Sequence, residues 1–100
     1  MSKISFNLDK LSEKNGIAFY RVSGASVANV FFIAIDRINH SLDLYLSDNF
    51  DKPVVSIDPK KDFSFSAVSM IDNRILAPVL ARAIDILNLD HYPSGISYAA

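Results

Sequence analysis

The residue types that most often perform catalysis are sparse in this sequence and form no recognisable motif. It has two histidines, His40 and His91, and the second follows Asp90 directly. A nucleophilic site needs a nucleophile, a base and an orienting group within hydrogen-bond reach. No nucleophile motif, phosphate-binding loop or dinucleotide fingerprint occurs, and Ser94 followed by Gly95 is typical of a turn. We therefore expect no catalytic residues and no enzymatic activity, and we expect His91 to interact with the negative end of a preceding helix.

Carboxylates are crowded in the middle of the chain, where they could bind a hard cation. The aspartates of this stretch are Asp48, Asp51, Asp58 and Asp62. A calcium loop also needs a central glycine and a terminal glutamate, which this stretch lacks, and aspartate is itself a favoured turn residue. Lys60 and Lys61 lie between Asp58 and Asp62, so the local charge nearly cancels. The pattern predicts solvated turns, with no metal site and no cofactor.

Composition excludes several classes of partner. The chain of 100 residues carries 10 basic and 11 acidic residues, a balance that does not favour nucleic acid. The absence of cysteine rules out disulfides and is compatible with a reducing cytoplasm. The longest apolar run, residues 30–35, is far shorter than the roughly 20 residues of a membrane-spanning helix, and the start lacks an apolar signal core. We expect one cytoplasmic domain, residues 1–100, without membrane contact.

The clearest structural pattern lies in residues 72–89, where apolar side chains recur at helical spacing. One stripe contains Leu76, Val79, Leu80, Ala83, Ile84 and Leu87. Asp72 suits an N-cap, whereas Pro78 predicts a kink or a helix that begins near Ala77. We expect a long carboxy-terminal helix that packs on a core through this stripe.

Alternating patterns elsewhere predict an antiparallel sheet of four to six strands. The expected strands are residues 4–8, 17–22, 27–36, 42–47, 54–57 and 63–66. Asn15-Gly16 is a strong turn signal. Residues 27–38 also fit a helical stripe, but their β-branched and aromatic side chains favour a strand, and residues 96–100 either add an edge strand or fray. The fold class is α+β, a meander with the helix on one face.

The expected register divides the apolar residues between the two faces of this sheet. The helix-facing set is Leu42, Leu44, Leu46, Phe63, Phe65, Phe31, Ile33 and Ile35. Tyr20, Phe32 and Tyr45 then lie on the opposite face. One helix covers one face, so these aromatic residues either mark a contact site or are covered by residues 1–8 and belong to the core.

A short, nearly neutral chain without catalytic signatures favours a binding function. We expect a non-enzymatic protein-binding domain that acts as an inhibitor or adaptor, of the kind carried by phages and mobile elements or paired with a toxin as its immunity partner. Its partner-binding residues would be Tyr20, Phe32 and Tyr45. The alternative is a self-associating homodimer that uses this face or an unpaired edge strand. A small-molecule site between sheet and helix is the third hypothesis.

Overall fold

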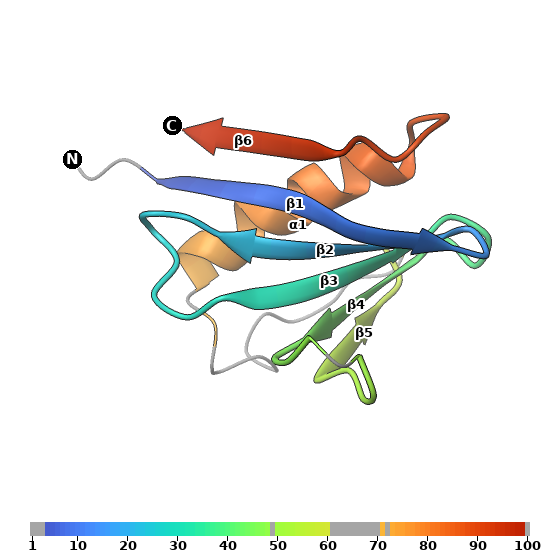
Figure 1. Ribbon diagram of the computed structural model, residues 1–100, viewed down its shortest axis with the longest axis horizontal. Coiled ribbons are helices and arrows are strands. Elements are labelled where there is room, and N and C mark those ends of the chain that lie inside the picture. The colour runs from blue at the N-terminus through green and yellow to red at the C-terminus, as the bar shows by residue number, and fades with distance from the viewer. Residues whose placement is uncertain (1–3, 49, 61–70, 72, 100) are drawn as a thin grey trace.

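The computed structural model describes residues 4–48, 50–60, 71 and 73–99 (Figure 1). Within them the elements are β1 (Ser5–Lys14), β2 (Ile17–Ser23), β3 (Phe31–Asp36), β4 (Ser41–Tyr45), β5 (Val55–Ile57), α1 (Asn73–Leu87) and β6 (Gly95–Ala99). The described strands form one antiparallel sheet in the order β5-β4-β3-β2-β1-β6. The predicted α+β class with an antiparallel sheet and one helix is therefore confirmed.

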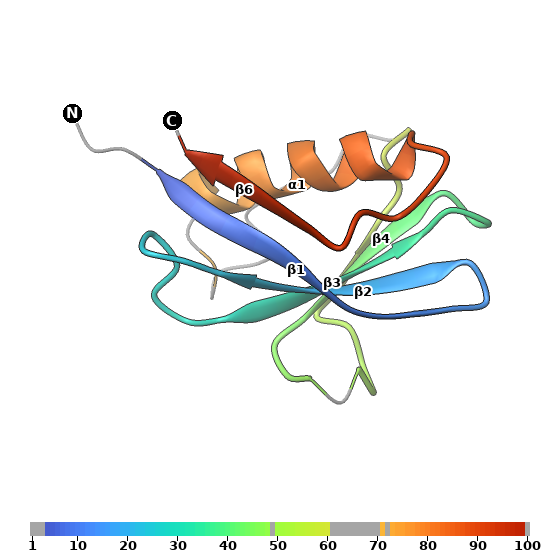
Figure 2. The same cartoon turned by 45° about the horizontal axis from the view of Figure 1, so that its top comes forward.

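The sheet is a meander from β1 to β5, and the chain then crosses the sheet to reach its opposite edge. The helix α1 lies on one face along this crossing, and β6 pairs with β1 beyond it (Figure 2). Because β6 follows α1, the helix is not the last element of the chain, and of the two expectations for residues 96–100 the edge strand is the one observed. The helix has 15 residues and includes Pro78, so it does not begin at Ala77.

The first hairpin follows from its turn chemistry. Asn15 and Gly16 both have positive φ, 55° and 81°, as the predicted two-residue turn requires. The strand before it is longer than predicted, because the polar residues that follow Leu8 continue the pairing with β2 as far as Lys14. A shift of register between Lys10 and Ser12 accommodates the change in alternation.

The segment whose pattern fitted either a helix or a strand contains the strand β3, which is shorter than the predicted strand 27–36. The segment 31–36 pairs with both β2 and β4, which excludes a helix there. The next strand ends at Tyr45, where the chain bends, so Leu46 is 40% exposed and does not face the helix as predicted. The predicted strand 63–66 and the expected N-cap Asp72 lie outside the described residues.

The main core lies between α1 and the sheet. The buried residues of the helix are Ile75, Leu76, Val79, Leu80, Ala83, Ile86 and Leu87. They pack on the buried sheet residues Phe6, Leu8, Ala18, Tyr20, Val22, Phe31, Ile33, Ile35, Leu42, Leu44 and Ile57. The predicted stripe is therefore confirmed apart from Ile84, which is only partly buried at its margin.

Candidate partner-binding surface

Three neighbouring strands bring aromatic side chains together on the face that α1 does not cover. Phe32 on β3 stands opposite Tyr45 on β4, and Phe19 on β2 stands opposite Ala34, two residues along β3 from Phe32. Directly opposed and diagonal side chains on one face are close enough to touch. Two of the three predicted residues, Phe32 and Tyr45, thus lie together on this face, and Phe19 is a member that the sequence did not identify.

A fourth aromatic ring comes from the loop between β4 and β5. Phe50 packs against all three strand residues, with ring centroids 4.5 Å from Phe19, 5.1 Å from Tyr45 and 5.7 Å from Phe32. The last two contacts are edge-to-face, with interplanar angles of 80° and 81°, the arrangement that ring quadrupoles favour. We call Phe19, Phe32, Tyr45 and Phe50 the aromatic surface.

The backbone of Phe50 is held in an unfavourable conformation by this packing. Its φ is 53°, a left-handed value that bulky side chains rarely adopt. Such a conformation costs on the order of 1 to 3 kcal/mol and persists only where surrounding contacts compensate for it. Contacts with three rings offset the cost here, so the loop places one more aromatic side chain on a face that already carries three.

The aromatic surface is only partly shielded from solvent. Phe19, Phe32 and Phe50 are half-buried, and Tyr45 is 8% exposed. Burial and the negative charge of Asp43 raise the pKa of the Tyr45 hydroxyl. The alternative that residues 1–8 cover this face is wrong for the described part of that segment. Its residues join the sheet as β1, and Phe6 and Leu8 belong to the core beneath the helix.

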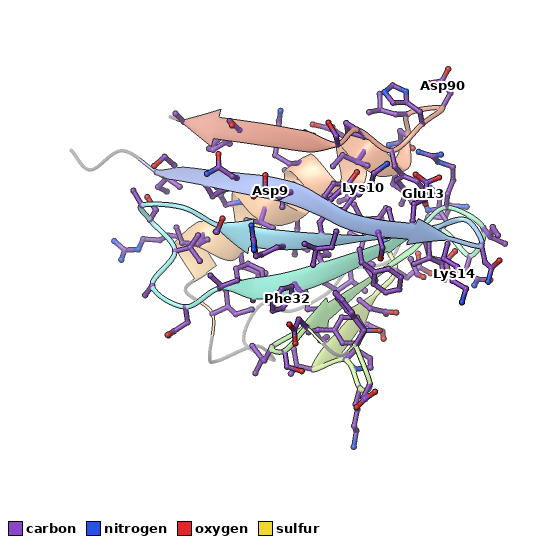
Figure 3. All side chains as sticks on the ribbon, in the orientation of Figure 1. Asp9, Lys10, Glu13, Lys14, Phe32 and Asp90 are labelled. Atoms are coloured by element: carbon purple, nitrogen blue, oxygen red, sulfur yellow. The ribbon has the colours of Figure 1, made fainter. Side chains whose placement is uncertain are left out.

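The remaining half of this face is polar. Asp9 and Phe32 mark the two halves in Figure 3, where α1 lies behind the sheet. Arg21 stands between them, opposite both residues, and its guanidinium lies 3.9 Å from the Asp9 carboxylate. Ser97 on β6 donates a 2.9 Å hydrogen bond to Asn7. The aromatic surface therefore has a charged rim on the β1 side.

Tyr20 does not belong to the aromatic surface, and the prediction that it lies on the face opposite the helix is wrong. It stands opposite Ile33 on the helix-facing side and is completely buried. Its hydroxyl donates a 2.6 Å hydrogen bond to the carbonyl oxygen of Pro93. Burial, and secondarily the charge of Glu13, raises the pKa of Tyr20 to about 12. Phe19 and Tyr20 are adjacent aromatic residues, so alternation alone could not show which one faces the helix.

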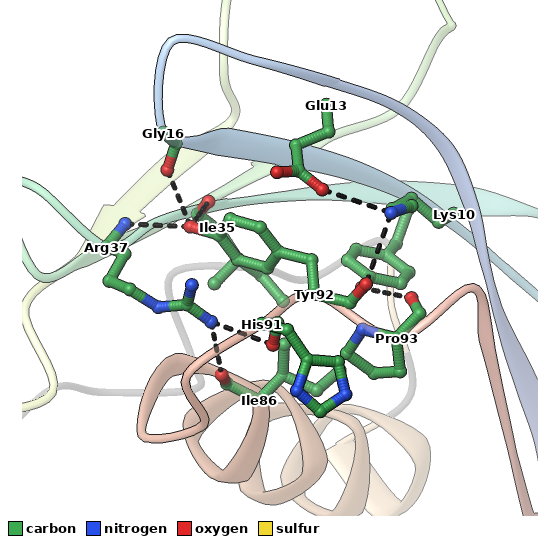
Figure 4. Close-up of polar contacts among 10 residues, drawn as sticks. Lys10, Glu13, Gly16, Ile35, Arg37, Ile86, His91, Tyr92 and Pro93 are labelled. Carbon is green, nitrogen blue, oxygen red and sulfur yellow. Dashed lines mark hydrogen bonds and ion pairs between the residues drawn. The ribbon is translucent and has the colours of Figure 1, made fainter.

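A polar cluster around Tyr92 and Arg37, next to the β1–β2 turn, has a structural role (Figure 4). The buried Tyr92 hydroxyl lies 2.6 Å from the carbonyl oxygen of Gly16 and 3.0 Å from that of Ile35, and it accepts a hydrogen bond from the amide of Arg37. The Arg37 guanidinium stacks on the Tyr92 ring at 4.1 Å and donates to the carbonyls of Ile86 and His91. Arg37 thereby satisfies a carbonyl of the last helical turn.

The two histidines have different surroundings. His91 pairs through Nδ1 with Asp90 at 2.8 Å, and both side chains are largely exposed. The hydrogen bond from His91 lowers the pKa of Asp90. Arg37, rather than the His91 ring, contacts the helix end. His40 Nδ1 is buried without a hydrogen-bond partner in the described part of the chain.

Two of the aspartates accept hydrogen bonds from backbone amides two or three residues further along the chain. Asp36 accepts hydrogen bonds from the amides of Ile38 and Asn39, and Asp58 accepts one from the amide of Lys60. No group of three potential metal ligands occurs in residues 4–48, 50–60, 71 and 73–99. Asp62 lies outside these residues.

Two further observations bear on function. No helix in the described part of the chain is long and apolar enough to cross a membrane. Comparison of the chain with protein-family models, with curated proteins and with solved structures found no match, so its function is inferred from the geometry alone.

Proposed function

We propose that this chain is a small non-enzymatic protein-binding domain that acts as an inhibitor or adaptor, of the kind carried by phages and mobile elements or paired with a toxin as its immunity partner. It binds its partner through the aromatic surface. The observation that supports this proposal is the cluster of Phe19, Phe32, Tyr45 and Phe50 on the sheet face opposite α1, in which the three phenylalanines are only partly buried.

The geometry of the cluster suits a contact site. Aromatic residues are enriched among those that contribute most to binding, because they bury a large area with few rotatable bonds. The ring of Phe50 is already held by three neighbouring rings, so ordering it costs little on association. A partner side chain that packs on Phe32 and Phe50 would remove their remaining exposed area from water.

The rim of the surface adds charge selectivity. Arg21 borders Phe32 on one side, and Asp43 stands opposite Ala34 on the other. Charges at a rim mainly affect the rate of association and the exclusion of wrong partners. We therefore expect the partner to carry both an apolar protrusion and polar residues around it, and we expect its association rate to fall with added salt.

Substitution of two surface residues tests the proposal. Phe32→Ala and Phe50→Ala should each weaken partner binding by about thirtyfold or more, the effect of losing a central aromatic contact. The control is Ile38→Ala, which truncates an apolar side chain that is 74% exposed on the turn between β3 and β4. The tagged variants and the unmodified chain are used to capture partners from an extract of the source organism, and the captured proteins are quantified.

The outcome is read from the comparison between variants. A protein that the unmodified chain and Ile38→Ala retain, and that both aromatic variants lose while still melting cooperatively, supports the proposal. A dissociation constant measured with that purified protein then gives the size of each effect. Equal recovery of the same proteins by all the chains would contradict a role of the aromatic surface.

A further inference from the structure

The outer strand β6 presents an open edge of the sheet. It pairs with β1 on one side, and no described strand lies on its other side. In Figure 1 it forms the upper edge of the sheet, with α1 passing behind. Ile96 and Tyr98 are half-buried on the helix side, whereas Gly95, Ser97 and Ala99 are exposed.

The pairing with β1 shows which backbone groups of β6 point outward. The amide of Lys10 donates to the carbonyl of Ser94, which continues the β1–β6 register by one position. Hydrogen-bonded and non-hydrogen-bonded pairs alternate in an antiparallel ladder, so Ile96 and Tyr98 direct their backbone groups to β1. The same alternation requires the backbone of Ser5 on β1 to point away from β6. Its amide and carbonyl do so, because both form hydrogen bonds with Ser26.

The backbone groups of Gly95, Ser97 and Ala99 therefore face outward. Proteins commonly protect such an edge with charged residues, proline, a bulge or a very short strand. The sequence of β6, from Gly95 to Ala99, has no charged residue and no proline. The opposite edge differs, because β5 has only three residues and is followed by Asp58 and Pro59.

We infer that β6 pairs with β6 of a second copy of this chain, in an antiparallel arrangement with a two-fold axis at Ser97. Ser97 then stands opposite the partner subunit's Ser97, and Gly95 opposite the partner subunit's Ala99. Each of these pairs exchanges two backbone hydrogen bonds, because these are the outward-facing residues of both copies. The result is one continuous sheet through the two subunits.

In this register the side chains of β6 stand opposite side chains of suitable size and polarity from the second β6. This favours a second copy of the chain over a foreign strand. On the helix side, Ile96 stands opposite the partner subunit's Tyr98, an aliphatic–aromatic pair of the kind that stabilises adjacent strands. Tyr98 is already positioned by its own subunit, since it stacks on Phe6 at 4.8 Å and lies 5.7 Å from the Arg82 guanidinium. On the other side the opposing residues are Gly95, Ser97 and Ala99, which are small and uncharged.

Sedimentation equilibrium of the full chain, from micromolar to millimolar concentration, measures the association. An interface of one short strand is small, so we expect a weak, reversible dimer. A mass that stays monomeric over the whole range would overturn the inference.

Charge substitutions at Ser97 test the position of the two-fold axis. Ser97→Lys and Ser97→Glu each place like charges directly opposite one another, so each variant alone should dimerise about tenfold or more weakly than the unmodified chain. An equal mixture of the two should recover the dimer, because Lys then faces Glu. Failure of the mixture to recover it, or dimerisation of the separate variants at the original strength, would show that the axis is elsewhere.

Removal of a single outward amide tests the hydrogen bonds. Ser97→Pro deletes a donor that faces away from β1, so the monomer should keep its fold while the dimer weakens about tenfold or more. Ser97→Ala is the matched control, because it also loses the bond to Asn7 but keeps the amide. Phe32→Ala should leave the dimer unchanged. If it dissociates the dimer, the copies associate through the aromatic surface and the inference is wrong.

Discussion

Arg37 and Tyr92 show how two side chains from distant segments can determine the position of a loop. The Tyr92 hydroxyl contacts Gly16 in the β1–β2 turn and the amide of Arg37, directly after β3. The Arg37 side chain in turn donates to the carbonyls of Ile86 and His91. Lys10 adds a hydrogen bond to the carbonyl of Tyr92. Removing one partner from such a buried network leaves other polar groups unpaired, which costs more than the lost bond alone.

The raised pKa of Tyr20 gives the protein a specific sensitivity to alkaline pH. Burial raises the pKa of Tyr20 from 10.0 to about 12, so the fold favours the protonated phenol. Its contribution to stability is fully present below the unfolded pKa and is lost as the pH rises through the folded one. The unmodified chain should therefore lose stability between about pH 10 and about pH 12.

Tyr20→Phe provides the comparison for this titration. The variant loses the hydrogen bond to Pro93 at every pH, but it has no phenolic proton at this position to release. Its melting temperature should start lower and then fall less steeply across the same pH range. Parallel melting curves for the two proteins above pH 10 would show that Tyr20 does not ionise with a raised pKa.

At the scale of elements, the same substitution should change the stability of the protein differently at two glycines. Gly24, after β2, has a φ of 133°, and an added Cβ would lie 2.8 Å from the Phe6 Cα. The φ of Gly95 on β6 is not positive, and an added Cβ would make an ordinary van der Waals contact, 3.5 Å from the Leu8 carbonyl oxygen. Gly24→Ala should destabilise the protein by more than about 1 kcal/mol, and Gly95→Ala should change stability by less than that or increase it.

Urea unfolding of the two variants measures this difference directly. Both substitutions add one methyl group beside β1, so they differ mainly in backbone conformation and available space. Equal free energies of unfolding would mean that the Gly24 turn relaxes at no cost. The predicted order would then be wrong.

The sequence predicted the elements well where a single period dominated. The helical stripe around Leu76 and Leu80 was long enough to identify both the helix and its buried face. The pattern could not show which face of the sheet a side chain lies on where two apolar residues are adjacent, as at Phe19 and Tyr20. The face is then determined by the pairing with β3. Phe50 carried no usable signal either, since it lies in a polar turn and reaches the sheet only through a left-handed backbone.

At the scale of the whole molecule, the two proposed contact regions are separate. The aromatic surface lies over β2, β3 and β4, whereas the open edge belongs to β6, beyond β1. A continuous sheet formed through β6 would leave both aromatic surfaces accessible, on the face opposite the helices. Two copies linked in this way could bind two partner molecules, which raises avidity when the partners are themselves linked.

The strand order also implies an order in which the strands of the sheet assemble and separate. Consecutive hairpins join β1 to β5, but the β1–β6 pair connects residues that are 90 positions apart, as for Asn7 and Ser97. Closing a longer loop costs more chain entropy, about 0.6 kcal/mol for each doubling of its length. We therefore expect β6 to dock after the meander has formed and to detach before it unfolds.

Native-state hydrogen exchange would show this ordering in the monomer. The amides of Ile96 and Tyr98 should exchange through a partial opening that requires less free energy than exchange at Ile33 in the central strand. Each such opening exposes Phe6 and Leu8 on β1, because β1 then becomes the sheet edge. Identical opening free energies at Ile96 and Ile33 would instead mean that the sheet opens as one cooperative unit.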